Sequence, residues 1–480
     1  MLNQTTFAPM KEFGELAVDT LNKSVCAYNF VETAKEKLTA AGFKQIYEKD
    51  IWKFVPGDKI FYTRNNSCII AFTVGKLYDE TKSCFKIIGA HTDSPNLRIA
   101  PNSYNPAGGL ERYNCQSYGG ALWFTWFDRD LSVAGKVVYR NAEGKLDTKI
   151  IKCDEPLFFI PNCPPHLKED RTTLKWNIET EMKPIIATTH VSSLLIENEE
   201  DKVNASKHDK KLGSVLRTVI LKELRKETKN ESLTFESIVD YDLVLYDTQP
   251  SKLIGLNKEF LSSGRLDNLG SSVPALYALI NVSKEEIIAQ QSSINIIALF
   301  DNEEIGSLTY QGANGSFFYN HLNRIYHQTS TNPSTDGFLA MCNRSFVVSA
   351  DLAHSYNPNF PQKFQNEHQN KTNEGVVIKI NANGRYSSDP ESGALIKEIA
   401  KKCNVPMQEF IVRQDSPCGT TIGPIISSRL GIRSVDVGIP QFAMHSIREM
   451  LGVCDLYYYR MLFEEFFKSY EECVGKLLEK

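Results

Sequence analysis

This sequence of 480 residues predicts an α/β fold in which helices cover a mixed β-sheet. Three observations support that class. Short apolar runs are bounded by Gly, Asn, Asp or Pro, which is typical of buried strands. Segments with helical spacing of apolar residues lie between these runs. Hydrophobic residues make up 42% of the chain and charged residues 23%, so the chain can bury enough apolar surface to fold.

The elements are expected in the following order along the chain. Two helical segments cover residues 11–42, because Phe13, Leu16, Leu21 and Leu38 recur at helical spacing and Gly42 ends the second segment. Buried strands are predicted at residues 67–74, 85–90, 241–246, 293–300, 346–350, 376–380 and 434–437. Further helices are predicted at residues 267–282, 393–403 and 456–477. Strands and helices in such alternation favour a sheet covered by helices.

Residues 101–248 differ in composition from the rest of the chain, and we expect them to form an inserted, β-rich domain. They contain Gly-Gly pairs at 108–109 and 119–120, a Pro-rich stretch at 160–165 and a charged segment at 197–229. A strand is expected at 134–139 and a helix at 212–224. Residues 1–100 and 249–480 then form one discontinuous domain.

The charge balance excludes one large class of partners. Lys and Arg number 54 and Asp and Glu number 58, so the formal net charge is −4. A protein that binds nucleic acid by neutralising phosphates needs a basic excess, which is not seen here.

No apolar stretch approaches the roughly 20 residues of a membrane span, and the first residues do not resemble a signal peptide. The eleven cysteines form no C-x-x-C pair. We therefore expect a cytoplasmic protein with reduced thiols.

Acidic residues and histidines gather where predicted strands end. His91 and Asp93 follow the strand at 85–90, Glu303 and Glu304 follow the strand at 293–300, and Asp351 follows the strand at 346–350. Ligands of open α/β sheets bind at the carboxyl edge of the strands. Each residue taken singly also has an ordinary explanation, such as a turn histidine or a solvated glutamate pair. The grouping is therefore the evidence for a site.

Two more residues complete a candidate metal site. Asp267 precedes the helix at 267–282 and by itself would be read as a helix N-cap. His445 follows the strand at 434–437 and by itself could be a partly buried histidine. Together with the strand-end residues they form the ligand inventory of a dinuclear zinc or manganese site, in which a free carboxylate takes a proton from a bridging water. No G-x-S-x-G, H-E-x-x-H or G-x-x-x-x-G-K-[ST] motif competes with this interpretation.

Seven strings of the sequence, taken in order from about His91 to Glu449, resemble the M18 aspartyl aminopeptidases, which are dinuclear metallo-exopeptidases. The strings are IIGAHTDSPNLRI, YGGALWFTWFDRDLSVAG, SGRLDNL, LFDNEEIGS, SADLAHSYNPNF, PCGTTIGPI and QFAMHSIREM. The resemblance implies a zinc-exopeptidase-like catalytic domain, an inserted domain that mediates assembly, and a homo-oligomer, namely a dodecamer built from dimers.

The resemblance also implies a role for each site residue. His91 and Asp351 would bind one metal, Glu304 and His445 the other, and Asp267 would bridge the two. Glu303 would be the general base acting on the metal-bridging water, and Asp93 would orient His91. The cofactors would be two divalent metal ions per subunit. Zinc is the expected metal, and manganese or cobalt is the alternative at an exchangeable position.

The same resemblance suggests further catalytic and substrate-binding residues. His166 aligns with a histidine that stabilises the tetrahedral intermediate from a neighbouring subunit. This chain has Pro164-Pro165 before it, where the family has an aliphatic pair. Lys379 and Tyr386 align with the segment that recognises an acidic substrate residue in the family. We expect Met444 and Glu303 to contact the substrate as well.

The implied function is an aminopeptidase that removes an amino-terminal residue, preferably Asp or Glu, from peptides with a free amino terminus. Three alternatives stay open from the sequence. They are an aminopeptidase with a preference for neutral residues, a related dinuclear amidohydrolase, and a catalytically silent assembly or cargo protein. The expected location is the cytoplasm, with entry into a vacuole-like compartment by a non-secretory route as an alternative.

Overall fold

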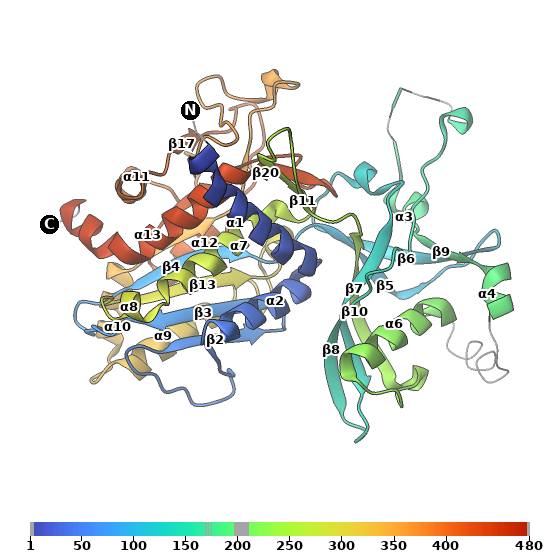
Figure 1. Ribbon diagram of the computed structural model, residues 1–480, viewed down its shortest axis with the longest axis horizontal. Coiled ribbons are helices and arrows are strands. Elements are labelled where there is room, and N and C mark those ends of the chain that lie inside the picture. Colours follow the sequence, from blue (N-terminus) through green and yellow to red (C-terminus); the bar gives the residue numbers. More distant parts are fainter. Residues whose placement is uncertain (1–3, 169, 171, 174, 196–210, 478–480) are drawn as a thin grey trace. The chain divides into compact units, whose positions relative to one another are not determined.

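The computed structural model describes the chain except for residues 1–3, 169, 171, 174, 196–210 and 478–480. The chain forms two compact units (Figure 1). The first comprises Met1–Asp93, Ser251–Met444 and Glu449–Lys480, and the second comprises Ser94–Pro250 and His445–Arg448. The predicted insert, 101–248, falls within the second unit. That unit begins earlier because a strand at Asn96–Tyr104 pairs with its sheet. Part of the charged segment at 197–229 lies outside the described residues.

A nine-stranded mixed sheet forms the centre of the first unit. Its order is β1-β2-β3-β13-β4-β14-β18-β16-β17. The strands β13, β4, β14 and β18 run parallel to one another. The bounds are β1 Lys44–Gln45, β2 Lys59–Arg64, β3 Cys68–Val74, β4 Phe85–His91, β13 Ile294–Phe300, β14 Phe346–Ala350, β16 Val376–Lys379, β17 Met407–Phe410 and β18 Arg433–Gly438. The predicted α/β class is confirmed.

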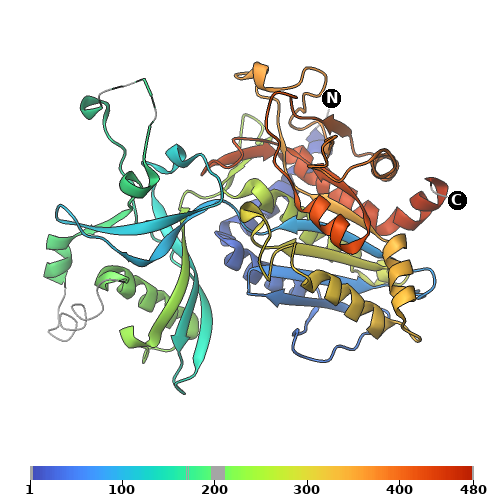
Figure 2. The same cartoon turned by 180° about the vertical axis from the view of Figure 1, so that it is seen from behind.

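Helices cover both faces of this sheet (Figures 1 and 2). One face packs against α1 (Gln4–Lys23), α2 (Ala27–Ala40), α7 (Leu266–Val282), α11 (Pro390–Lys402) and α13 (Val453–Leu477). The other packs against α9 (Phe317–Thr329), α10 (Thr335–Arg344) and α12 (Ile422–Leu430). A short helix, α8, spans Glu285–Ile288. Successive strand residues point to opposite faces, so Ile69 joins one core and Ile70 the other. This explains why the strands read as continuous apolar runs.

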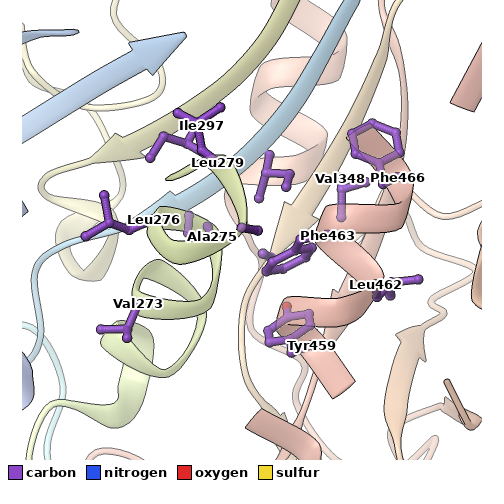
Figure 3. Packing of buried hydrophobic residues seen from close by; sticks show 14 of the residues in the cluster. Val273, Ala275, Leu276, Leu279, Ile297, Val348, Tyr459, Leu462, Phe463 and Phe466 are labelled. Carbon is purple, nitrogen blue, oxygen red and sulfur yellow. The ribbon is translucent and has the colours of Figure 1, made fainter. Parts of the chain in front are cut away.

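The helices α7 and α13 pack against each other over the sheet (Figure 3). Leu276 and Leu279 of α7 lie in the same cluster as Tyr459 and Phe463 of α13, and all four are buried. The rings of Tyr459 and Phe463 pack against each other in a tilted arrangement, with centroids 4.3 Å apart. Leu266 and Leu269, on either side of Asp267 at the start of α7, are buried in the same cluster.

Replacing Phe463 by alanine is expected to lower the free energy of unfolding by about 3–5 kcal/mol, because a fully buried ring leaves a cavity that the sheet below cannot fill. Urea-induced unfolding measures the change. Lys468→Ala on the exposed side of the same helix serves as the control, with an expected change within about 0.5 kcal/mol. Similar losses for the two variants would contradict the assigned packing.

A five-stranded sheet lies elsewhere in the first unit, in the order β11-β12-β20-β19-β15. Its strands are β11 Lys252–Ile254, β12 Phe260–Ser263, β15 Ala353–His354, β19 Pro440–Phe442 and β20 Glu449–Gly452. The chain enters α7 after β12 and two connecting residues, and it enters β15 two residues after Asp351. This small sheet therefore anchors the segments that leave the ends of the central sheet.

The second unit is built on a six-stranded antiparallel sheet of order β8-β7-β10-β5-β6-β9. Its elements are β5 Asn96–Tyr104, β6 Leu110–Tyr118, β7 Leu131–Arg140, β8 Leu146–Lys152, β9 Ile185–Thr188, β10 Ile238–Asp247, α3 Ile178–Glu181, α4 Thr189–Leu195 and α6 Gly213–Thr228. The amphipathic helix α6 buries Leu216 and Ile220 in a core shared with Val133 and Trp126. Among the residues that the structure describes, no helix in either unit has both the length and the apolar character of a membrane span.

Candidate active site

Three neighbouring strands of the central sheet bring the predicted acidic residues together. Strands β13, β4 and β14 are adjacent and parallel, and Phe300 of β13 lies opposite His91 of β4. Their carboxyl ends therefore share one edge of the sheet, as the sequence suggested. His91 ends β4, Glu303 and Glu304 follow β13, and Asp351 follows β14.

The imidazole of His91 has two different sides. Nδ1 lies 3.0 Å from the backbone oxygen of Asp93 and 3.3 Å from its Oδ1. Nε2 lies 3.4 Å from Asp267 Oδ1, 3.7 Å from Asp351 Oδ1 and 3.8 Å from Glu303 Oε2. A carbonyl oxygen only accepts hydrogen bonds, so the Nδ1 proton points to Asp93 and Nε2 is the nitrogen available to a metal.

Asp93 also positions the two glutamates. The backbone N–H groups of Glu303 and Glu304 donate to its Oδ1 and Oδ2, each at 3.1 Å. The two glutamates begin a short 3-10 helix, Glu303–Ile305, directly after Asn302. Asp93 thus links the histidine side and the glutamate side of the site. Its bond to the glutamate backbone was not foreseen from sequence, because the two segments are about 200 residues apart.

Asn302 is a supporting residue that sequence reasoning missed. It adopts φ 65 and ψ 26, a left-handed conformation that asparagine tolerates better than most residues. Its Oδ1 accepts hydrogen bonds from Thr309 Oγ1 at 2.9 Å and from Gln311 Nε2 at 2.7 Å. An Asp-Asn pair immediately after a buried strand is the sequence signal for such a turn. The turn reverses the chain so that Glu303 and Glu304 follow the strand end closely.

Asp267 takes part in the cluster and does not act as a simple helix cap. Its own φ and ψ, −81 and 103, are non-helical, and its peptide bond to Asn268 is cis. Its backbone N–H donates to Glu449 Oε2 at 3.1 Å, and Asn268 Nδ2 donates to the oxygen of Ala350 at 2.8 Å. Glu449 and Asn268 are thus two further buried residues of the site that sequence reasoning did not identify.

The electrostatics of the cluster favour a bound cation. Burial lowers the pKa of His91, but hydrogen bonds to Asp267, Asp351 and Asp93 raise that pKa well above its ordinary value. Burial raises the pKa of Glu303 to about 8. The charge of His91 lowers this pKa, and the nearby carboxylates raise it. Burial, with the charge of Asp267 next, also raises the pKa of Glu304 well above its ordinary value. Protonation lowers the repulsion between these groups, and a bound cation would do the same.

The donor set matches that of a zinc-type ion. The ligand atoms of His91, Asp267 and Asp351 lie within 4.8 Å of one another, and so do those of His91, Glu303 and Glu304. One imidazole nitrogen with carboxylate oxygens is a common set for zinc and manganese. The first group contains the histidine and aspartate that we predicted for one metal, together with the predicted bridging aspartate.

Two predicted residues belong to the second unit. His445 lies in the segment His445–Arg448 that groups with that unit, and its backbone oxygen accepts a hydrogen bond from Leu122 N at 2.9 Å. His166 is exposed in a short 3-10 helix, Pro165–Leu167. The roles of His445 as a metal ligand and of His166 as a catalytic donor stay predictions.

Lys379 and Tyr386 lie close to the predicted metal ligand Asp351. The lysine is only 4% exposed, so its side chain is buried and does not face solvent. Its Nζ donates to the oxygen of Leu352 at 2.9 Å and to Asp351 Oδ2 at 3.3 Å, and it lies 4.9 Å from the ring centroid of Tyr386. Met444 is half-buried against the main core.

Comparison with known proteins identifies the family. Residues 20–467 match the family model described as aminopeptidase I zinc metalloprotease (M18). The chain belongs to the M18 family. The resemblance stated from the seven sequence strings is confirmed, and the protein is a metalloaminopeptidase, a hydrolase of peptide bonds.

Several known proteins are similar to this chain over nearly its whole length. A probable aspartyl aminopeptidase of Ricinus communis is 39% identical, over 96% of each chain, and an aspartyl aminopeptidase of Aspergillus oryzae is 40% identical, over 94% of each. Among solved structures, a cryo-EM structure of the Ape4 and Nbr1 complex matches with a TM-score of 0.94 and 36% identity, covering 100% of this chain and 90% of that one. The mApe1 dodecamer of S. cerevesiae matches with a TM-score of 0.83 and 27% identity, covering 98% and 99%.

Removing divalent metal from this M18 enzyme with a chelator is expected to lower its thermal midpoint, and added Zn²⁺ should restore it, because the buried carboxylates then lose the cation that offsets their repulsion. The restoring shift should be larger at about pH 8 than at about pH 6. The raised pKa of His91 means that protons compete with the metal for Nε2, and binding must release them. Differential scanning fluorimetry at both values measures this. Asp267→Asn is the control and should shift less at either pH, whereas equal shifts of the parent enzyme would contradict the assigned site.

Proposed function

We propose that this M18 enzyme removes an amino-terminal Asp or Glu from peptides, with Glu303 as the general base. The observation that carries the proposal is the cluster around His91 Nε2, where the carboxylates of Asp267, Asp351 and Glu303 converge within 3.8 Å. The backbone N–H of Glu303 donates a hydrogen bond to Asp93, and this bond leaves the Glu303 carboxylate available to the reacting water. Its proton would then pass to the leaving amine.

The residues that would hold two divalent ions are His91 and Asp351 for one, Glu304 and His445 for the other, and Asp267 for both. Bound there, zinc or a similar ion would lower the pKa of water and polarise the scissile carbonyl. The number and identity of the ions belong to this proposal. We propose that Asp93 orients both the imidazole of His91 and the backbone of Glu303 and Glu304.

The preference for acidic residues would come from Lys379. Its ammonium is buried, is paired with Asp351 and lies over the ring of Tyr386, so a substrate carboxylate would meet a fixed positive charge in a dry setting. Met444 would line the substrate site beside these groups. The curated relatives are named aspartyl aminopeptidases, which favours this preference over a neutral one, an amidohydrolase activity or a silent cargo role.

A kinetic panel of dipeptides with Asp, Glu, Leu or Ala at the amino terminus tests the proposal, together with metal analysis of the purified enzyme. We expect the highest kcat/KM for Asp and Glu, no hydrolysis of the same peptides when amino-acetylated, and about two divalent ions per chain. Equal cleavage of acidic and neutral substrates would overturn the acidic preference. Cleavage of the acetylated peptides would favour the amidohydrolase alternative.

We also propose a homo-oligomer in which His166 reaches the site of a neighbouring subunit to stabilise the tetrahedral intermediate. The likeness to a solved dodecamer supports assembly, and the exposure of His166 leaves it available to a neighbour. We propose a cytoplasmic location as well, in which the eleven cysteines would stay reduced.

Replacing His166 by alanine is expected to lower kcat by about 10²–10³, as the loss of one oxyanion donor does. Action between subunits is tested by complementation, in which His166→Ala and Glu303→Gln subunits are dissociated, mixed equally and reassembled. About a quarter of the sites should regain activity, because each restored site pairs an intact Glu303 with an intact neighbouring His166. Absence of recovery, or a fully active dilute monomer, would contradict action in trans.

A further inference from the structure

Asp436 is a fully buried carboxylate in the middle of β18, about 85 residues along the chain from Asp351. Its Oδ1 accepts hydrogen bonds from Ser349 Oγ at 2.7 Å and from Thr421 Oγ1 at 2.6 Å. Its Oδ2 accepts from the backbone N and from the Oγ of Ser387, both at 2.6 Å. Four short bonds satisfy both oxygens, which makes the burial of this charge tolerable.

These bonds end next to the groups that surround the Lys379 ammonium. Ser387 directly follows Tyr386, whose ring lies 4.9 Å from Nζ. Ser349 is two residues before Asp351, whose Oδ2 accepts from Nζ at 3.3 Å. Lys379 itself extends from β16, where the preceding residue, Ile378, pairs with Val437 next to Asp436. One carboxylate therefore ties together the three segments that enclose the lysine.

The backbone around Asp436 strengthens the link to the tyrosine segment. Ser388 Oγ accepts from the N–H of Asp436 at 2.9 Å. The helix α12 approaches so closely that a Cβ on Gly423 would lie 2.3 Å from Asp436 Oδ2. The segment at 386–388 lies beside Asp436 of β18 and belongs to no strand or helix, so these side-chain bonds, together with the packing of Tyr386 on Val377 and Phe410, position the tyrosine in place of a regular ladder.

We propose that Asp436 is a positioning residue for substrate specificity, because it holds the segments that carry Tyr386 and Asp351 next to the Lys379 ammonium and so places that charge for an acidic substrate side chain. Asp436 contacts none of the residues of the metal cluster directly in the bonds described, so it acts through Ser387 and Ser349. The inference rests on the proposed acidic preference and adds the device that maintains it.

The test compares kcat/KM for Asp- and Leu-terminated peptides in the metal-loaded, full-length enzyme. Asp436→Asn keeps the shape but replaces an accepting oxygen by an N–H donor. We expect the Asp/Leu ratio to fall about 10- to 100-fold, mainly through a higher KM for the Asp peptide, with metal content unchanged. Ser387→Ala removes one of the bonds and should lower the ratio about 3- to 10-fold. This milder variant keeps the proposal testable if Asp436→Asn does not fold.

The matched control is Ser427→Ala in α12, the helix that approaches Asp436. This variant removes an equally short bond, which Ser427 Oγ donates to the oxygen of Ile432 at 2.7 Å, and it leaves the bonds of Asp436 intact. Its Asp/Leu ratio should equal that of the parent enzyme. Parallel loss of both substrates in Asp436→Asn and Ser387→Ala, or an unchanged ratio in both, would overturn the positioning role. A parent enzyme without acidic preference would instead show that the proposed function has failed, and the positioning role with it.

Discussion

Replacing Glu303 by glutamine is expected to lower kcat on Asp-terminated peptides by about 10²–10⁴, while the fold and the bound metal are retained. Glutamine has nearly the same shape and keeps the backbone N–H that donates to Asp93 at 3.1 Å. It cannot take a proton from water or return one to the leaving amine. Steady-state kinetics on an Asp-terminated peptide, with metal analysis of the same sample, measures both parts of the expectation.

The neighbouring glutamate provides the control for this result. Glu304→Gln should lose metal as well as activity, because Glu304 is the assigned ligand and Glu303 is the assigned base. The two residues begin the same short helix, and each donates its backbone N–H to one oxygen of Asp93, so a difference between the two variants reports on chemistry and not on folding. Near-full turnover of Glu303→Gln, or loss of metal from it alone, would show that the roles are wrongly assigned.

The second large effect concerns substrate choice. Lys379→Met is expected to lower the ratio of kcat/KM between Asp- and Leu-terminated peptides by about 10²–10³, because a desolvated charge that pairs with the substrate carboxylate is lost. Methionine keeps much of the apolar stem that packs in the core. The ratio is the essential measurement, since absolute activity also responds to the loss of the bond between Nζ and Asp351.

Tyr386→Phe is the matched variant for this prediction. It keeps the ring whose centroid lies 4.9 Å from Nζ and removes only the hydroxyl, so the Asp/Leu ratio should change by less than tenfold. Metal analysis of Lys379→Met separates a specificity effect from a damaged Asp351 ligand. If Lys379→Met cleaves both peptides in the parent ratio, Lys379 does not recognise the substrate.

The elements of the catalytic unit could be predicted well because their signals are local. The strand expected at 293–300 is β13, Ile294–Phe300, and the helix expected at 267–282 is α7, Leu266–Val282. Continuous apolar runs between turn residues mark strands buried on both faces, and those faces are now seen as two cores. The pairing order of the strands was not predictable, since it depends on contacts between segments hundreds of residues apart.

The same distinction applies to the active site. Residues at strand ends, such as His91 and Asp351, were identifiable because parallel strands of an α/β sheet bring their carboxyl ends to one edge. Asn302, Glu449 and Asp436 were not identified. Glu449 and Asp436 matter through hydrogen bonds with distant segments, for example the bond that the backbone N–H of Asp267 donates to Glu449 Oε2, and a lone buried acid has no sequence signature. Asn302 matters through a local turn, in which it accepts from Thr309 and Gln311.

The sequence by itself determined the α/β class and the family, and it predicted a set of residues for the chemistry, because strand runs, turn residues and ordered motifs are written locally along the chain. Only the tertiary structure decided that Nε2 of His91 faces the carboxylates, that Asp93 holds both glutamates, and that Lys379 is buried against Asp351. These are distances and directions between side chains from separate strands. They are determined by strand order, register and packing, which no single segment encodes.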